Sequence, residues 1–418
     1  MNKQELKEIV IDQSKRRIGE DLIDRDIYDK AEETIKNKFI IIISGIRRSG
    51  KSTLLNQLRE KYLGYYLNFD DDRLVHFKIE DFQILYEIFL ELFGERDYFY
   101  FDEIQNIEGW ERFVRRLHDE NLKIFVTGSN ASMLSRELGT HLTGRHLEIP
   151  IYPFSFLEYL KFKNIELEKN WQYNTHKRVE IKKAFNEYLY LGGFPEYLHS
   201  KNKEYLKTLY ENILYRDILV HYNLSNEKAL KELVYYSASN VSKEISFNRM
   251  KKMIGLGSST TVKEYFAYLE NSYLVFLLPK FEYSLKKQIF ANKKIYFIDN
   301  ALALNLGFRI SDDKGRLLEN LVFTELKRRK NEVYYFSEKG ECDFVIKEGN
   351  KIIKAIQVCH DFNKDNEKRE INGLLESLKK FKLKKGIILT NDQEEEIKIE
   401  NRLVKIVPVW KFLLEKDF

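Results

Sequence analysis

The sequence is poor in cysteine and proline, and it contains no long hydrophobic run. Of its 418 residues, 2 are cysteine and 5 are proline. The two cysteines, Cys342 and Cys359, cannot form a disulfide framework, and no CxxC pair indicates a zinc site. No apolar run approaches the roughly 18–20 residues that span a bilayer. Because the first ten residues are charged and amphipathic, unlike a secretory leader, we expect a cytoplasmic protein without a membrane segment.

The composition indicates a folded chain with more than one domain. Hydrophobic residues make up 43% of the chain and charged residues 32%, and the 29 Phe and 26 Tyr argue against disorder. A chain of 418 residues corresponds to about two to four domains. The net charge of +5, from 70 basic and 65 acidic residues, neither demands nor excludes a nucleic-acid partner.

Strand-like and helical segments alternate over the first 130 residues. Residues 39–43 form a continuous apolar run, and residues 65–69, 98–101 and 123–127 are further strand candidates. Apolar residues recur at helical spacing between these runs. Continuous apolar strands that alternate with helices predict an α/β domain with a buried parallel sheet.

A phosphate-binding pattern follows the first of these strands. Residues 45–52 read GIRRSGKS and match G-x-x-x-x-G-K-[ST], with a strand before and a helix after. Glycines let backbone N–H groups surround phosphate oxygens, the lysine supplies positive charge and the serine hydroxyl binds Mg²⁺. The pattern predicts a nucleotide with Mg²⁺, held by Gly45, Arg48, Ser49, Gly50, Lys51, Ser52 and Thr53.

Residues 98–103, YFYFDE, are an apolar strand that ends in two acids. We expect Asp102 to bind Mg²⁺ together with Ser52, and Glu103 to orient or deprotonate the attacking water. We also expect this strand to lie beside the strand that precedes the loop. The alternative is a pair of strand-end acids exposed to solvent.

The strand over residues 123–127 also ends in polar residues. Thr127, Ser129 or Asn130 could bind the γ-phosphate or its attacking water, because the carboxyl ends of parallel strands meet at one edge of the sheet. The alternative is an ordinary turn, since Gly, Ser and Asn are common turn residues.

Four segments together resemble a known family. GIRRSGKST, FYFDEIQNIEGWE, VTGSNASML and LTGRHLEIPIYPFSFLEY occur in this order and resemble the prokaryotic AAA-type ATPases, over nearly the whole chain. The resemblance implies that the nucleotide is ATP, that Asp102 and Glu103 are the second acidic motif and that Ser129 or Asn130 is the first sensor. It also implies that Arg145 is an arginine finger for a neighbouring subunit's nucleotide, hence a homo-oligomer. The alternative for Arg145 is a surface salt bridge.

Residues 192–195, GGFP, resemble the motif by which ATPases of the STAND group contact the nucleotide from a lid helix. By this resemblance Pro195 would contact the nucleotide. From the residues alone, the segment is a turn followed by a helix start.

The middle of the chain has a pattern of DNA-binding proteins. Helices are predicted over residues 247–254 and 258–270, separated by a glycine turn and followed by a strand over 273–278, which is the order of a helix-turn-helix with a wing. The alternative is a module that packs against protein, with lysines that only aid solubility. The candidate phosphate-contacting residues are Lys251, Lys252, Lys263, Lys286 and Lys287.

The last part of the chain resembles PD-(D/E)xK nucleases, in which a helix Glu, a strand Asp and a following (D/E/Q)-x-K bind a divalent metal. Glu319, Asp343 and Gln357 occur in this order, but Cys359 stands where the lysine belongs. A thiol cannot supply the charge of the lysine, and Gln is a poorer Mg²⁺ ligand than a carboxylate. We therefore expect a nuclease remnant that does not cleave.

The expected fold class is α/β, with four domains. A P-loop NTPase core with a parallel sheet (1–153) precedes a helical lid (154–222), a winged helix (223–300) and a restriction-endonuclease-like α/β domain (301–418). The expected function is Mg²⁺-dependent ATP hydrolysis by an AAA-type protein that acts on DNA. The alternatives are a nucleotide-gated binding or scaffold protein with negligible turnover, and an ATP-regulated nuclease.

Overall fold

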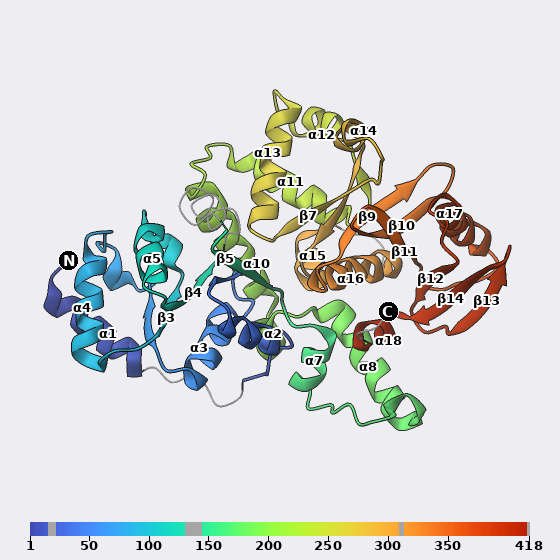
Figure 1. Cartoon of the computed structure of the whole chain (residues 1–418). Coiled ribbons are helices and arrows are strands. Elements are labelled where there is room, and N and C mark those ends of the chain that lie inside the picture. Colours follow the sequence, from blue (N-terminus) through green and yellow to red (C-terminus); the bar gives the residue numbers. More distant parts are fainter. Residues whose placement is uncertain (16–21, 130–143, 309–312, 416–418) are drawn as a thin grey trace. The chain divides into compact units, whose positions relative to one another are not determined.

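The computed structural model describes residues 1–15, 22–129, 144–308 and 313–415 (Figure 1). The chain forms two compact units, Met1–Tyr152 and Pro153–Phe418. None of the helices in the described ranges combines the length and the apolarity that crossing a membrane requires.

The first unit is built on a five-stranded parallel sheet with the order β2-β3-β4-β1-β5. β1 and β4 are buried along their whole length, as apolar strands covered on both faces must be. The parallel sheet expected from the sequence is confirmed. Its strands are β1 (Ile40–Gly45), β2 (Tyr65–Asn68), β3 (Tyr98–Asp102), β4 (Lys123–Gly128) and β5 (His146–Ile151).

One expectation about this sheet is wrong, because β3 does not lie beside β1. β4 separates them, since Val126 pairs with Ile42 on one side and with Phe101 on the other. β4 is completely buried and therefore suits a central position, whereas Tyr98 at the start of β3 is half-buried. The acids at the end of β3 therefore face the phosphate-binding loop across the end of β4.

Helices cover both faces of the sheet (Figure 1). Alternate strand residues face opposite sides: Ile40 and Ile42 join an aromatic core under α1, α4 and α5, whereas Ile41 and Ile43 pack against α3. Residues 22–27, between α1 and α2, are not helical. The helices are α1 (Lys3–Lys15), α2 (Tyr28–Glu33), α3 (Lys51–Lys61), α4 (Asp81–Phe93) and α5 (Trp110–Asp119), with short 3-10 turns η1 (Thr34–Lys36), η2 (Asp72–Leu74) and η3 (Ile104–Asn106).

The second unit begins with a helical segment, as the sequence predicts. Apolar side chains from facing helices fill its interior, among them Phe156, Tyr159 and Tyr188, whose rings contact one another. The elements are α7 (Phe156–Phe162), η4 (Trp171–Tyr173), α8 (Thr175–Leu191), α9 (Pro195–Ser200), α10 (Lys203–Asn212), η5 (Ile213–Val220) and α11 (Glu227–Ser239).

A small antiparallel sheet with the order β6-β8-β7 follows. The two helices predicted before it are present as α12 and α13. They are joined by a turn in which Gly255 has φ 74°, a left-handed conformation that glycine adopts without steric cost. The elements are β6 (Glu244–Ile245), α12 (Phe247–Ile254), α13 (Ser259–Asn271), β7 (Val275–Pro279), α14 (Leu285–Phe290), β8 (Lys293–Phe297) and α15 (Asn300–Leu306).

The unit ends with a six-stranded mixed sheet of order β13-β14-β12-β11-β10-β9. The sequence did not predict β13 and β14; β13 reads EEIKI, and its two apolar residues, Ile397 and Ile399, are too few for a clear strand signal. The elements are α16 (Lys314–Arg328), β9 (Glu332–Ser337), β10 (Glu341–Glu348), β11 (Lys351–Val358), α17 (Glu367–Lys380), β12 (Lys385–Thr390), β13 (Glu395–Ile399), β14 (Arg402–Pro408) and α18 (Val409–Leu414).

The small sheet and the six-stranded sheet contact each other directly. The N–H of Phe281, just after β7, donates to the carbonyl of Tyr335 in β9 at 2.7 Å. The Tyr335 hydroxyl donates to the carbonyl of Asn292, just before β8, at 2.9 Å. Segments on both sides of residue 300 therefore pack together within the second unit.

Asp299 holds the junction between the helical segment and α15. Its buried carboxylate accepts the N–H groups of Gly193, Ala301 and Leu302 at 2.7, 2.8 and 3.2 Å. A Cβ atom at Gly192 would lie 2.2 Å from this carboxylate, so a side chain does not fit there. Burial raises the pKa of Asp299 to about 6, although the three N–H groups favour its charged form.

This raised pKa makes the stability of the second unit depend on pH. The folded state retains a proton that the unfolded state, with a pKa of 3.8, releases, so the free energy of unfolding should fall as pH rises through about 4 to 6. We expect a loss of about 2 kcal/mol between pH 4.5 and 7.5 in the wild type that is missing in Asp299→Asn. Urea unfolding at both pH values measures it. Asp365→Asn, at an exposed position, is the control, and an equal pH dependence in Asp299→Asn would contradict the prediction.

Candidate nucleotide-binding site

The phosphate-binding loop connects β1 to α3 and needs its glycines for steric reasons. A Cβ atom at Gly45 would lie 2.1 Å from the carbonyl oxygen of Ile151 in β5. Gly50 has φ 97° and caps α3, so it also occupies a conformation that side chains rarely adopt. The loop therefore leads directly into the N-terminus of α3, the end of a helix that favours anions.

Lys51 directs its ammonium group back into this loop. Its Nζ lies 3.2 Å from the carbonyl oxygen of Gly45, 3.3 Å from that of Ile46 and 3.6 Å from Oε1 of Glu103. The side chain is almost completely buried. One cation from the start of α3 and one carboxylate that follows β3 thus meet at the carboxyl edge of the sheet.

Asp102 is completely buried at the end of β3. Burial raises the pKa of its carboxyl group, and the neighbouring charge of Glu103 acts in the same direction, whereas hydrogen bonds from Thr127 and Ser52 oppose the shift. The Ser52 hydroxyl and the Asp102 carboxylate are thus in direct contact. Both are oxygen ligands of the kind that Mg²⁺ requires, so the residues present fit this ion.

Glu103 has a left-handed backbone conformation, with φ 51°, which is costly for a residue with a side chain. Its N–H donates to the Thr127 hydroxyl at 2.9 Å, and its carboxylate accepts a hydrogen bond from Gln105 at 2.5 Å. The Thr127 hydroxyl in turn donates to Asp102. A single hydroxyl at the end of β4 therefore positions both acids.

Ser49 and Arg25 add two features to the loop. Among the described residues, the Ser49 hydroxyl is buried and has no hydrogen-bond partner, so it is available as a donor to a bound anion. Arg25 donates to the carbonyls of Ser49 at 2.6 Å and Tyr152 at 2.7 Å, and so it links the loop to the end of β5. Sequence reasoning missed Arg25, because a lone arginine before the first strand carries no local signal.

Arg145 does not lie with these residues. It precedes β5, whose register places His146 beside Ile40 and Ile151 beside Gly45. Arg145 therefore lies at the amino edge of the sheet, about 20 Å along β1 from the loop. Its guanidinium group pairs with Asp119 at 2.6 Å. Any contact of Arg145 with a nucleotide would have to involve another subunit's site.

Two further residues, Asn130 and Pro195, are predicted to contact the nucleotide. Asn130 lies outside the described residues, and Ser129 is buried at the end of β4. Pro195 is the first residue of α9 in the second unit, and the preceding Gly193 donates its N–H to Asp299. The roles assigned to Asn130 and Pro195 stay predictions.

The three residues predicted as a nuclease remnant do lie together in the second unit. The N–H of Asp343 donates to the Gln357 side chain at 3.2 Å. Oδ1 of Asp343 and Oε1 of Glu319 both accept hydrogen bonds from Lys294, at 2.8 and 3.0 Å. Sequence reasoning missed Lys294, because it lies on β8, well before the nuclease-like pattern.

Comparison with known proteins assigns the chain to a family. An AAA domain matches residues 37–160, and two domains of unknown function, DUF8612 and DUF4143, match residues 182–314 and 314–412. The uncharacterized protein MJ1544 of Methanocaldococcus jannaschii is 37% identical over 97% of this chain and 94% of its own length. An uncharacterized protein of Haemophilus influenzae is 31% identical over 90% of this chain and 94% of its own.

Two solved structures are also similar to parts of the chain. DnaA from Aquifex aeolicus, bound to AMPPCP, is 18% identical over 62% of this chain and 90% of its own, with a TM-score of 0.25. Cdc6p from Pyrobaculum aerophilum is 12% identical over 73% and 97%, with a TM-score of 0.26. Likeness at these TM-scores carries no argument about this chain. The other two comparisons do carry one: the chain belongs to the same family as these archaeal and bacterial proteins, and its residues 37–160 form an AAA domain of the P-loop ATPase type.

Proposed function

We propose that this protein binds ATP with Mg²⁺ at the phosphate-binding loop and hydrolyses it. The observation that carries the proposal is the meeting of Lys51, Ser52, Asp102 and Glu103 at one edge of the sheet, with Thr127 between the two acids. In an ATPase of this kind, positioning and charge stabilisation supply most of the catalysis.

Each residue has a distinct part in this reaction. Lys51 neutralises phosphate charge, and Ser49 and the backbone N–H groups of the loop donate to phosphate oxygens. Ser52 and Asp102 would hold Mg²⁺, which when bound polarises the phosphate oxygens. Glu103 orients the attacking water and accepts its proton.

Phosphate release from ATP tests this proposal. We expect release in Mg²⁺ that stops when EDTA is added, and we expect binding of a fluorescent ATP analogue to the same sample. Tight binding without release would instead favour the alternative of a nucleotide-gated scaffold. The absence of both binding and release would contradict the proposal altogether.

Arg145 supports a homo-oligomer within this proposal. Its guanidinium group lies at the amino edge of the sheet, where it could reach the nucleotide of a neighbouring subunit but not that of its own. Arg145→Ala should then lower phosphate release without weakening ATP binding, and mass measurement of the protein should show an oligomer. A monomeric protein whose phosphate release is unaffected by Arg145→Ala would contradict the role of Arg145 as an arginine finger.

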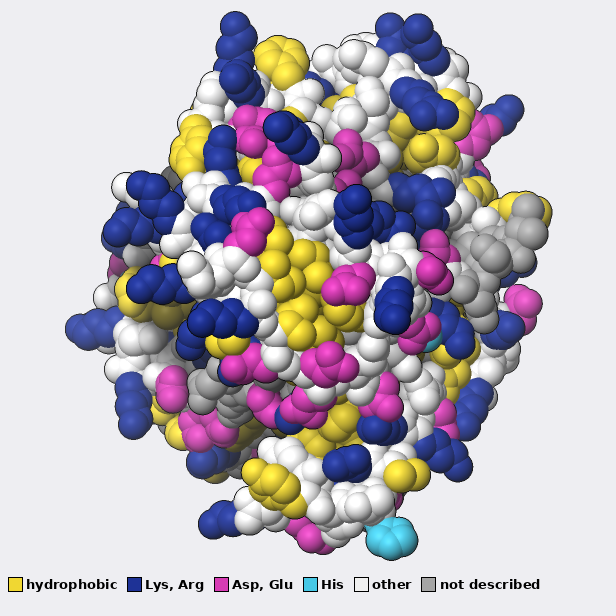
Figure 2. All heavy atoms as spheres, turned by 90° about the vertical axis from the view of Figure 1, so that its right-hand side faces the viewer, with side chains coloured by type: hydrophobic (Ala, Val, Ile, Leu, Met, Phe, Trp, Pro, Cys, Tyr) yellow, Lys and Arg dark blue, Asp and Glu magenta, His cyan; other side chains and the backbone are white. Residues whose placement is uncertain are grey.

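The proposed partner of the second unit is DNA. α12, α13, β7 and β8 follow one another in the order of a helix-turn-helix with a wing, and Lys252, Lys263, Lys286 and Lys287 are exposed on this segment. On the face drawn in Figure 2, however, Lys and Arg side chains are scattered among Asp and Glu. Binding would therefore depend on this local group of lysines and not on a field of one sign over the whole surface.

The salt dependence of DNA binding tests this partner. Affinity for a DNA duplex should fall steeply between 50 and 200 mM salt, and the double variant Lys286→Glu/Lys287→Glu should bind about tenfold more weakly with a shallower salt slope. Lys384→Glu/Lys385→Glu, two exposed lysines at the start of β12, is the matched control. An equal loss of DNA affinity in both double variants would indicate that binding depends on net charge alone and not on Lys286 and Lys287.

A further inference from the structure

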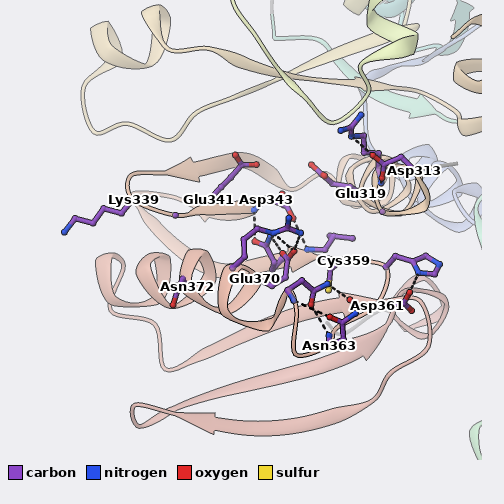
Figure 3. A pocket seen from close by; sticks show the side chains of 18 residues that line it. Asp313, Glu319, Lys339, Glu341, Asp343, Cys359, Asp361, Asn363, Glu370 and Asn372 are labelled. Atoms are coloured by element: carbon purple, nitrogen blue, oxygen red, sulfur yellow. Dashed lines mark hydrogen bonds and ion pairs between the residues drawn. The ribbon is translucent and has the colours of Figure 1, made fainter. Parts of the chain in front are cut away.

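A cluster of acidic residues outside the nucleotide site lines an open cavity of about 800 Å³ in the second unit. Figure 3 shows Glu319 on α16 across from Glu341 and Asp343 on β10, with Glu370 of α17 on the other side of Asp343. This is the region that resembles a nuclease site. Its chemistry therefore depends on what neutralises the carboxylates.

A single lysine, Lys294, neutralises these carboxylates. Nζ of Lys294 lies 3.0 Å from Glu319, 2.6 Å from Glu341 and 2.8 Å from Asp343. An ammonium group has three N–H donors, so these three carboxylates use all of them. The Lys294 side chain is only 2% exposed, although Glu341 reaches the surface. Burial alone would lower the pKa of Lys294, but Asp343 and Glu319 hold it well above its usual value.

Further hydrogen bonds fix several atoms of the cluster. Oδ2 of Asp343 accepts the N–H of Val358 at 2.9 Å, and Oε1 of Glu319 accepts the Tyr296 hydroxyl at 2.6 Å. Gln357 accepts from the N–H of Asp343 and donates to Glu370 at 2.8 Å. These hydrogen bonds therefore hold Glu319, Asp343 and Gln357 in place beside the ammonium group.

A divalent metal does not fit this arrangement. Mg²⁺ requires oxygen ligands at about 2.0–2.1 Å and near-octahedral geometry, and here it would have to share the three carboxylates with an ammonium group that already lies 2.6–3.0 Å from each of them. Within the described ranges, His, Cys, Asp and Glu residues form no group of three or more arranged to hold a metal ion. Burial raises the pKa of the Cys359 thiol to about 12, so this residue supplies no compensating charge.

We propose that the Lys294 ammonium group is the resident cation of this cluster. It takes the place of a divalent metal between Glu319 and Asp343, so that the native pocket binds no catalytic metal. Without the lysine charge, the three carboxylates would lack a counter-ion and would be able to draw together around a divalent cation. Since Lys294 lies on β8 and its partners on α16 and β10, the same contacts tie the small sheet to the six-stranded sheet.

Mn²⁺ binding to the full chain without nucleotide tests the proposal, with free Mn²⁺ followed by electron paramagnetic resonance. Wild type and Asp343→Asn should bind Mn²⁺ equally, because any Mn²⁺ at the phosphate-binding loop is common to both. Lys294→Gln should bind one further Mn²⁺ per chain, with an affinity at least about tenfold above that of the wild-type cluster. Lys294→Gln/Asp343→Asn should lose that ion.

Three outcomes would overturn the proposal. The first is Mn²⁺ binding by the wild type that Asp343→Asn abolishes, and the second is a folded Lys294→Gln that gains no Mn²⁺. The third is plasmid cleavage by the wild type in Mn²⁺ that depends on Asp343, since Lys294 would then serve an active nuclease. If Lys294→Gln does not fold, the comparison of wild type with Asp343→Asn decides: equal binding supports the proposal and unequal binding contradicts it.

Discussion

Replacement of Glu103 by Gln is expected to lower the rate of ATP hydrolysis by about 100-fold or more while ATP binding persists. The substitution keeps the shape of the side chain and an oxygen that can accept from Gln105, but it removes the group that takes the proton of the attacking water. It also removes the carboxylate 3.6 Å from the Lys51 ammonium, so phosphate should meet less competition for that charge. Phosphate release and binding of a fluorescent ATP analogue measure the two effects separately.

Two further variants make this result specific. Glu108→Gln changes an exposed acid of the same segment and should leave hydrolysis at the wild-type rate. Lys51→Ala should weaken ATP binding itself, because it removes the positive charge inside the loop. If Glu103→Gln hydrolyses ATP like the wild type, the water is activated by another group and the role given to Glu103 is wrong.

Replacement of Thr127 by Val is expected to slow hydrolysis by about tenfold or more and to lower the free energy of unfolding by about 2 kcal/mol. Valine has nearly the same shape as threonine, but it cannot donate to the Asp102 carboxylate or accept the N–H of Glu103. The N–H of Glu103 would lose its partner, and nothing else in this set of contacts holds the left-handed backbone at φ 51°. Asp102 and Glu103 would both lose the hydrogen bond to Thr127 that fixes their positions relative to each other.

Thr127→Ser keeps the hydroxyl and is the matched control, with hydrolysis close to that of the wild type. Phosphate release and urea unfolding are measured on all three proteins. A Thr127→Val protein that is less stable but hydrolyses ATP at the wild-type rate would show that the hydroxyl supports only the fold. In that case Asp102 and Glu103 would keep their proposed roles, but Thr127 would not be needed to position them for hydrolysis.

The sequence predicts those parts of the candidate site that are formed by short runs of consecutive residues. The phosphate-binding loop of residues 45–52 and the acids that follow an apolar strand can be recognised from their local spacing. A loop and a strand end are each formed by consecutive residues, so the sequence shows them directly. The helix over residues 247–254 can be predicted for the same reason, since its apolar residues recur every three or four positions. These parts needed no knowledge of distant contacts.

The sequence by itself therefore determined the chemistry of the loop, the succession of strands and helices and the AAA character of the first unit. Only the tertiary structure decided that β4 separates β3 from β1, that Arg25 braces the loop and that Lys294 lies among the carboxylates. These contacts join residues 24 or more positions apart in the chain, as Arg25 with Ser49 and Lys294 with Asp343. No local period or spacing encodes such pairs, because they arise from the packing of whole elements against one another.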